Sequence, residues 1–450
     1  AIQTDPQQLL IIESAKHLRH QAGENEENIG VAAAVSNFDF AILQQKIRRV
    51  EAQSHHQIVG SDLSVCCGRV SYLLGCTGPS YTVNTACSSS LVAVNTAVHS
   101  LRHLQCLLHM VLSANVILSP HVTVAYAKMG MLSQDGRCHS FDRSANGYVR
   151  AEACNGINIG REYLREDSAP LAVVATSVKQ DGRSAGLTAP NGLAQQKLLV
   201  DASMKAGIPL NDIEFQEMHA TGTPLGDPIE VNSFIQALQY FGSNKTSAEQ
   251  SSEKKQNTFI SGIKAERGHS EPCAGLSGSL SLIHAISNCK VVSNKRLRSL
   301  NQHFSMGSAS TGLPFPVIPG PATTSKHEVC SAVNSFAFQG TIARILIRHD
   351  FADPIWKMER PNLACKKVTF QKASFGFHPK AFDSHKIRLE MLPALDTLAI
   401  RKPYFRFSHF KTYLNACCSD IHHDLMHKKR FSITTNAVMV TQTQLDANKH

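Results

Sequence analysis

The sequence predicts a layered α/β fold. Helical patterns at 88–107, 192–206 and 228–240 alternate with short β-rich runs, which lie at 29–35, 81–86, 171–175, 215–219, 258–263 and 342–347. Hydrophobic residues make up 42% of the 450 residues and charged residues 18%, so the chain can bury a large core and is not disordered. Alternation of strands and helices indicates a largely parallel sheet with helices on its faces.

No membrane span or leader is expected from the pattern of apolar residues. The longest mainly apolar stretch, 91–118, is broken by polar residues, which are Asn95, His99, Arg102, His103 and Gln105. The first ten residues, AIQTDPQQLL, have neither a basic region nor a small-residue cleavage site. The 13 cysteines form no C-x-x-C pair, and their number is odd. We therefore expect free thiols in an intracellular, reducing compartment, the cytoplasm or an organelle.

The basic charge is concentrated in the last hundred residues. Residues 351–450 hold 16 basic and eight acidic residues, whereas the first 350 hold 29 basic and 27 acidic residues. The strand–helix alternation also ends near residue 348. We interpret 349–450 as a linker or appendage; a basic surface for an acidic partner is the alternative. No nucleic-acid motif accompanies the charge, so we expect no nucleic-acid partner.

Cys87 is the first candidate for chemistry. The segment GPSYTVNTACSSSL (78–91) is typical of a strand, a tight turn and a helix whose start is rich in small hydroxyl residues. A cysteine at a helix N-terminus lies near free backbone N–H groups and the positive end of the dipole, so we expect a lowered thiol pKa. A thiolate is the nucleophile that attacks thioesters. Taken alone, however, a cysteine is more often a small buried apolar residue.

Two histidines and a lysine follow predicted strands. His219 comes at the end of one strand and precedes a loop rich in glycine, proline and hydroxyl residues. Lys264 and His269 follow the strand at 258–263, and the loop NSFAFQGT (334–341) can offer backbone N–H donors. Sites assemble at the carboxyl ends of strands in open α/β sheets. Each residue alone fits a structural role, and the histidines lack the spacing of a metal site, so we expect no metal.

Six segments together resemble the ketosynthase (beta-ketoacyl synthase) domain of type I-like polyketide synthases. They are TACSSSLVAV around Cys87, MLSQDGRCHSFDRSANGYVR (131–150), QDGRSAGLTAPNG (180–192), HATGTPLGDPIE (219–230), the segment with Lys264 and His269, and NSFAFQGT. The resemblance implies a thiolase-like layered fold, αβαβα, of two similar βαβ halves. It places the N-terminal half at 1–168, the C-terminal half at 169–348 and a basic extension at 349–450.

The resemblance also implies a role for each site residue. Cys87 would accept an acyl chain, and His219 and His269 would support decarboxylation of a malonyl-type extender. Lys264 would hold His269 and tune the site. The backbone N–H groups of Cys87 and Phe338 would form the oxyanion hole, with Phe338 as gatekeeper. Two hydroxyl residues, Thr221 and Thr223, would line the pantetheine path.

The implied activity is decarboxylative Claisen condensation in polyketide or fatty acid chain elongation. Its partner would be an acyl carrier protein whose phosphopantetheine arm carries the acyl and malonyl-type thioesters, with no cofactor bound directly. Members of the superfamily are usually homodimers, and the segment before Cys87 would supply the pairing strand. The segment GHSEP (268–272) lacks the final glycine of a G-H-S-x-G acyltransferase motif, so the extender would be loaded by a partner.

The chain departs from the family at several positions. Alanine replaces glycine at 220, 151, 153 and 337, glutamine at 339, and Ile342 and Arg344 replace Asn and His. A Cβ clashes wherever a glycine holds a positive φ, so we expect a reshaped site. Glu266 lies between Lys264 and His269, and we expect it to draw the lysine away or raise the pKa of the histidine. The family also has a first strand before 5–8, whose loss would expose a sheet edge.

Two other functions stay open at this point. A catalytically weak ketosynthase-like domain would act as a docking or structural unit of a synthase. Another thiolase-like enzyme or a fatty-acid-elongating homologue is the third interpretation. The acyl chain length, the extender and the role of 349–450 do not follow from the sequence.

Overall fold

The structure is a computed structural model of the chain. It describes residues 4–22, 28–47, 55–161, 171–243, 258–288, 290–305, 313–320, 328–350, 409–410, 431–434 and 439–440. Most of the basic extension lies outside the described residues. The predicted boundary at 168/169 also lies outside them.

The helices and strands alternate along the first 350 residues. The α-helices are α1 (Pro6–Ala22), α2 (Asp39–Ile47), α3 (His55–Ser61), α4 (Val65–Leu74), α5 (Ser89–Arg102), α6 (Pro120–Lys128), α7 (Gly192–Ala206), α8 (Gly226–Ser243), α10 (Lys264–Arg267) and α11 (Ala274–Ser287). The 3-10 turns within the described residues are η2 (Ala86–Ser88), η3 (Leu210–Asp212) and η4 (Glu271–Cys273). The strands are β1 (Ile29–Ala34), β2 (Ser80–Val83), β3 (Leu108–Asn115), β4 (Ala153–Arg161), β5 (Leu171–Gln180), β6 (Phe215–Glu217), β7 (Phe259–Ser261), β8 (Glu328–Phe336), β9 (Thr341–Asp350), β10 (His409–Phe410), β11 (Phe431–Thr434) and β12 (Met439–Val440).

The main sheet is mixed, with strand order β2-β1-β3-β4-β11-β5-β9-β8-β6-β7. Strand β1 runs parallel to β2 and β3, and β6 runs parallel to β7 and β8. The pairs β3/β4, β8/β9 and β5/β9 are antiparallel. The prediction of a largely parallel sheet is therefore wrong, because β4 and β9 reverse direction and pair with the strands before them. Strand β9 follows β8 through the short turn 337–340, and β4 follows β3 through the stretch that contains α6.

The two halves of the sheet repeat one pattern. In each, three parallel strands (β2-β1-β3 and β7-β6-β8) are followed by an antiparallel one, β4 or β9. In the second half, β5 continues the sheet antiparallel to β9. In the first half, β11 takes the corresponding place antiparallel to β4, and it also pairs with β5. The predicted fold of two similar halves is confirmed by this topology.

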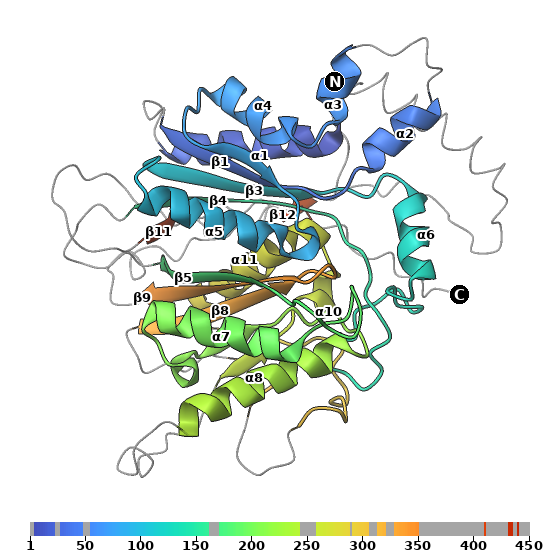
Figure 1. Cartoon of the computed structure of the whole chain (residues 1–450), viewed down its shortest axis with the longest axis vertical. Coiled ribbons are helices and arrows are strands. Elements are labelled where there is room, and N and C mark those ends of the chain that lie inside the picture. Colours follow the sequence, from blue (N-terminus) through green and yellow to red (C-terminus); the bar gives the residue numbers. More distant parts are fainter. Residues whose placement is uncertain are drawn as a thin grey trace.

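Helices lie between the two halves of the sheet and on the outer face of each half, so the fold has five layers, which Figure 1 shows edge-on. Helices α1 and α4 pack on β1, β3 and β4; α5 and α11 lie between the two halves; α7 covers β5 and β9, and α8 packs on α7. The apolar residues at helical spacing along α5 are fully buried, namely Leu91, Val94, Ala97, Val98 and Leu101. Each large apolar side chain among them contributes about 1.5–3 kcal/mol to the stability of the core. The central helix that follows Cys87 is thus firmly anchored.

Three buried strands are missed by the sequence prediction, and one predicted helix is too long. The pattern at 88–107 predicts a helix, but α5 ends at Arg102 and β3 begins at Leu108. Strands β3, β4 and β8 are buried on both faces, so they lack the alternation that marks a half-exposed strand. No described helix is long and apolar enough to cross a membrane.

Candidate active site

Cys87 lies in the predicted tight turn between a strand and a helix. Strand β2 leads into η2, and α5 follows at once. Ser89 Oγ accepts a hydrogen bond from Thr85 N (2.9 Å) and donates one to Ala86 O (2.6 Å). Ala86 has a φ of 51°, in the left-handed region, so the turn is sharp. The hydroxyl residues therefore brace this turn, and Ser88 at the start of α5 makes no capping bond through its side chain.

The thiol of Cys87 faces a histidine. Its Sγ lies 3.0 Å from Nε2 of His269, and the cysteine is only partly exposed. Burial of the sulfur among protein atoms raises the pKa of Cys87 to about 12, and the charge of Glu271 adds to this. The positive charge of Lys264 opposes the rise in pKa. The expected lowering of this pKa is thus wrong, because desolvation outweighs the helix dipole.

His219 is held in one orientation by the last loop. The ring Nδ1 accepts a hydrogen bond from the backbone N–H of Phe336 at 3.2 Å. A neutral imidazole whose Nδ1 accepts must carry its proton on Nε2. Burial lowers the pKa of His219 well below 6.5, and the charges of Lys264 and His269 lower it further. The ring is therefore a neutral hydrogen-bond donor at physiological pH.

His269 is positioned by a backbone bridge to the segment around Arg150. Its N–H donates to Val149 O and its carbonyl accepts from Ala151 N, both at 2.8 Å. Burial, Lys264 and Arg150 hold its pKa well below 6.5. The rings of His219 and His269 are perpendicular, with centroids 5.4 Å apart. The structure thus brings Cys87 and both histidines together.

Lys264 acts on this group at a distance. It begins α10 and is 3% exposed. Its charge lies close to three buried acids, Glu217, Asp227 and Glu230, and opposes the rise in pKa that burial causes in each. Burial keeps both imidazoles uncharged, and the charge of Lys264 lowers their pKa values further. Its influence on His269 is thus electrostatic.

Glu266 does not disturb the site. Its carboxylate forms an ion pair with Lys295 at 2.6 Å, and both side chains are well exposed. The expectation that it draws Lys264 away is wrong, because the short helix α10 buries Lys264 and turns Glu266 outward. The pKa of His269 is lowered rather than raised.

The glycine replacements differ in their effect. Ala220 has a φ of 40°, in the left-handed region where alanine is strained. Its N–H and that of His219 donate to the carboxylate of Glu230, at 2.9 and 2.8 Å. By contrast, Ala337 and Gln339 do not have positive φ; within their loop only Gly340 does, at 95°. The expected clash is therefore confined to Ala220.

The residues predicted to act as gatekeeper and to line the pantetheine path lie near the cysteine loop or the start of α8. Phe338 is 38% exposed, and its ring packs edge-on against Tyr126. Its backbone N–H opposes the rise in the pKa of Cys87 that burial causes. Thr223 Oγ1 accepts from Gly226 N at 3.1 Å, which stabilises the start of α8. Thr221 is buried, with its hydroxyl 3.5 Å from that of Thr223.

A buried ion pair beside the site was missed by the sequence reasoning. Arg150 binds both carboxylate oxygens of Glu271, with Nη2–Oε2 at 3.0 Å, and donates to Thr123 Oγ1 at 2.8 Å. Its guanidinium also lies over the ring of Tyr126. Both charged residues stand inside motifs that the resemblance includes, but no sequence signal pairs them.

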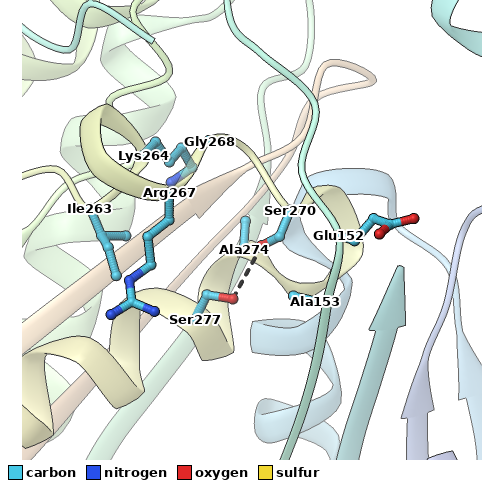
Figure 2. Close-up of a pocket in the computed structure, with 9 residues that line it drawn as sticks. All are labelled: Glu152, Ala153, Ile263, Lys264, Arg267, Gly268, Ser270, Ala274 and Ser277. Carbon is cyan, nitrogen blue, oxygen red and sulfur yellow. Dashed lines mark hydrogen bonds between the residues drawn. The ribbon is translucent and has the colours of Figure 1, made fainter. Parts of the chain in front are cut away.

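A small cavity lies behind the site (Figure 2). It has a volume of about 10 Å³, and Lys264, Gly268, Ser270 and Ser277 are among the residues that line it. The hydroxyls of Ser270 and Ser277 hydrogen-bond at 3.1 Å in its wall. This volume accommodates about one water molecule, so the cavity is not the seat of an acyl chain.

Two consecutive family models match the chain. The beta-ketoacyl synthase N-terminal domain matches residues 1–163, and the C-terminal domain matches residues 171–297. With the layered fold, these matches place the chain among acyltransferases with a thiolase-like fold. The chain belongs to the beta-ketoacyl synthase family.

Similar proteins come from bacteria and fungi. The chain is 35% identical over 352 residues to a phenolphthiocerol/phthiocerol polyketide synthase of Mycobacterium tuberculosis, covering 76% of this chain and 15% of that protein. It is 34% identical to the cyclo-acetoacetyl-L-tryptophan synthase of Aspergillus oryzae, over 85% of this chain and 10% of that one. The solved ketosynthase from module 6 of the Bacillus subtilis bacillaene synthase aligns with a TM-score of 0.67 and 27% identity, covering 77% of this chain and 60% of that one. The chain thus spans a small part of its full-length curated relatives.

Proposed function

We propose that the chain catalyses decarboxylative Claisen condensation, joining an acyl group on Cys87 to a malonyl-type extender. The observation that carries the proposal is the 3.0 Å approach of Cys87 Sγ to His269 Nε2, with the neutral ring of His219 at right angles. A nucleophile, a base and a hydrogen-bond donor then meet in one buried place.

The first half-reaction loads the cysteine. Because the Cys87 pKa is raised, the thiol loses its proton to His269 Nε2 as the sulfur attacks the thioester carbonyl. The carbon–sulfur bond to the carrier breaks, and the carrier thiol leaves with that proton. The backbone N–H groups of Cys87 and Phe338 would stabilise the oxyanion of the tetrahedral intermediate.

The second half-reaction makes the carbon–carbon bond. The malonyl carboxylate leaves as carbon dioxide, and its bonding electrons form an enolate. The Nε2–H of His219, fixed by the Phe336 contact at Nδ1, would donate to the enolate oxygen, with His269 as the second histidine. The enolate carbon attacks the acyl carbonyl, the bond to the Cys87 sulfur breaks, and the departing thiolate takes up a proton from water.

The proposal implies partners for the site. The thioesters would arrive on the phosphopantetheine arm of an acyl carrier protein, past Thr221 and Thr223. A homodimer would form through β2, which ends the sheet order and has an open outer edge among the described strands. The halves 1–168 and 169–348 each contribute catalytic residues, so neither would act alone. Residues 349–450 would form an extension, of which β11 joins the sheet between β4 and β5.

Acylation of the cysteine tests the proposal directly. The purified chain is mixed with a short acyl-pantetheine thioester, and its intact mass is measured beside that of Cys87→Ala. We expect one acyl adduct per chain, absent from the variant. No adduct on a folded wild-type chain would contradict the proposal and favour the docking or structural role. Release of carbon dioxide from malonyl-pantetheine tests the second half-reaction.

A further inference from the structure

Arg344 is a cation buried in the centre of the second half of the sheet. It is fully buried on β9, where it pairs in register with Asn334 of β8. Nη1 donates to Asn334 Oδ1 at 2.6 Å and to Gln216 Oε1 at 2.7 Å. In the described part of the chain, Nε and Nη2 have no hydrogen-bond partner. An incompletely paired buried cation costs stability, so its presence calls for an explanation other than stability.

The contacts of Arg344 continue to the backbone of His219. Because the guanidinium only donates, it fixes Oδ1 of Asn334 toward itself and leaves Nδ2 to face away. That Nδ2 donates to Glu230 Oε1 at 2.9 Å. The Glu230 carboxylate in turn accepts from the N–H groups of His219 and Ala220, at 2.8 and 2.9 Å. A short chain of hydrogen bonds therefore joins Arg344 to the histidine loop.

The same end of β8 holds the rest of the site. Next to Asn334, the hydroxyl of Ser335 donates to Cys87 O at 2.7 Å. One residue further, Phe336 N donates to His219 Nδ1. Three consecutive residues thus make one contact each: Asn334 with Glu230, Ser335 with the backbone of Cys87, and Phe336 with the ring of His219. A shift of Asn334 would be passed to all three contacts.

The strained backbone at Ala220 makes this clamp important. A φ of 40° is unfavourable for alanine, so the loop after β6 keeps this shape only while other contacts hold it. The two bonds to Glu230 lie at that point. Burial raises the pKa of Glu230, whereas its hydrogen bonds with Ala220, Asn334 and His219 and the charge of Lys264 favour the ionised form, which accepts both N–H groups.

We infer that Arg344 is a positioning residue: through Asn334 and Glu230 it holds the His219 loop in the geometry that decarboxylation requires. It does not touch the reacting atoms. The role rests on the proposed function, but the loop geometry itself can be measured without activity.

The test compares Arg344→Met with Arg348→Met. Arg348 lies on the same face of β9, is also mostly buried, and has no such chain of bonds to His219 among the described residues. Amide hydrogen exchange is followed by mass spectrometry for the peptide that contains His219 and Ala220. Carbon dioxide release from malonyl-pantetheine gives kcat and KM, and Arg344→Lys, which keeps a buried cationic donor, is measured beside them.

We expect Arg344→Met to speed exchange of this peptide about ten-fold and to lower kcat about 10- to 100-fold, with KM within about two-fold of wild type. Arg344→Lys restores part of both, and Arg348→Met changes neither. Equal exchange and kcat in the two methionine variants would overturn the inference. If Arg344→Met does not fold, Arg344→Gln, whose amide ends two bonds short of Nη1, takes its place. A folded wild type that releases no carbon dioxide counts against the proposed function, while the exchange data still decide the role of Arg344.

Discussion

The ion pair of Arg150 with Glu271 tests how strongly burial determines the contribution of an ion pair to the free energy of unfolding. Its side chains are 4% and 8% exposed, and the guanidinium binds both carboxylate oxygens. The ion pair of Lys295 with Glu266 has a contact of 2.6 Å, but its side chains are 50% and 39% exposed. The substitution Glu→Gln at each position therefore removes one charge from each of two pairs that differ in burial.

We expect Glu271→Gln to lower the free energy of unfolding by about 3–5 kcal/mol, because it leaves the Arg150 charge buried without an anion. The new amide also turns an N–H group toward the guanidinium, which has only donors. Glu266→Gln should cost less than about 1 kcal/mol, since water replaces its partner.

Urea unfolding followed by circular dichroism measures both variants at pH 7 and low salt. The double variant Arg150→Met, Glu271→Met removes both charges and should be more stable than Glu271→Gln. Similar losses for Glu271→Gln and Glu266→Gln would refute the reasoning that burial decides the energy of these pairs.

Backbone conformation and pKa lead to three further expected outcomes. Ala220→Gly should stabilise the chain by about 1 kcal/mol, because it removes the strain of an alanine in the left-handed region. Ala337→Gly, at a buried position without positive φ, should destabilise the chain. Thermal unfolding in which both variants shift the melting temperature in the same direction would contradict this. Carbon dioxide release should be level between about pH 6 and 8, because the pKa values of His219 and His269 lie well below 6.5, and a midpoint near 6.5 would show a charged histidine. Burial lowers the pKa of His109 from 6.5 to about 4, so the neutral ring contributes to stability above pH 6.5 and this contribution is lost as the pH falls. Between pH 7 and 5, the free energy of unfolding in urea should fall by about 2 kcal/mol more for the wild type than for His109→Gln. Equal falls in the two proteins would contradict this.

Sequence patterns predicted the turns and helices that carry the site better than the interior of the sheet. The turn at Cys87 and helix α7 follow from short-range signals, which are capping residues, glycine and apolar spacing. Strands β3, β4 and β8 were missed because polar residues such as His109, Asn155 and Asn334 interrupt their apolar runs, although the strands are buried on both faces. Their direction depends on pairing between distant segments, which no local pattern encodes.

For the site, the sequence by itself supplied the residue types and their order: a cysteine after a strand, two histidines at strand ends, and a lysine. Only the tertiary structure decided how they act. Burial, a property of the whole fold, raised the pKa of Cys87 although the thiol lies at a helix N-terminus. The same packing left Glu266 exposed and buried Lys264. The path from Arg344 to His219 includes the bond between Asn334 and Glu230, which are 104 residues apart in the chain, so it exists only where the fold brings β8 beside the start of α8.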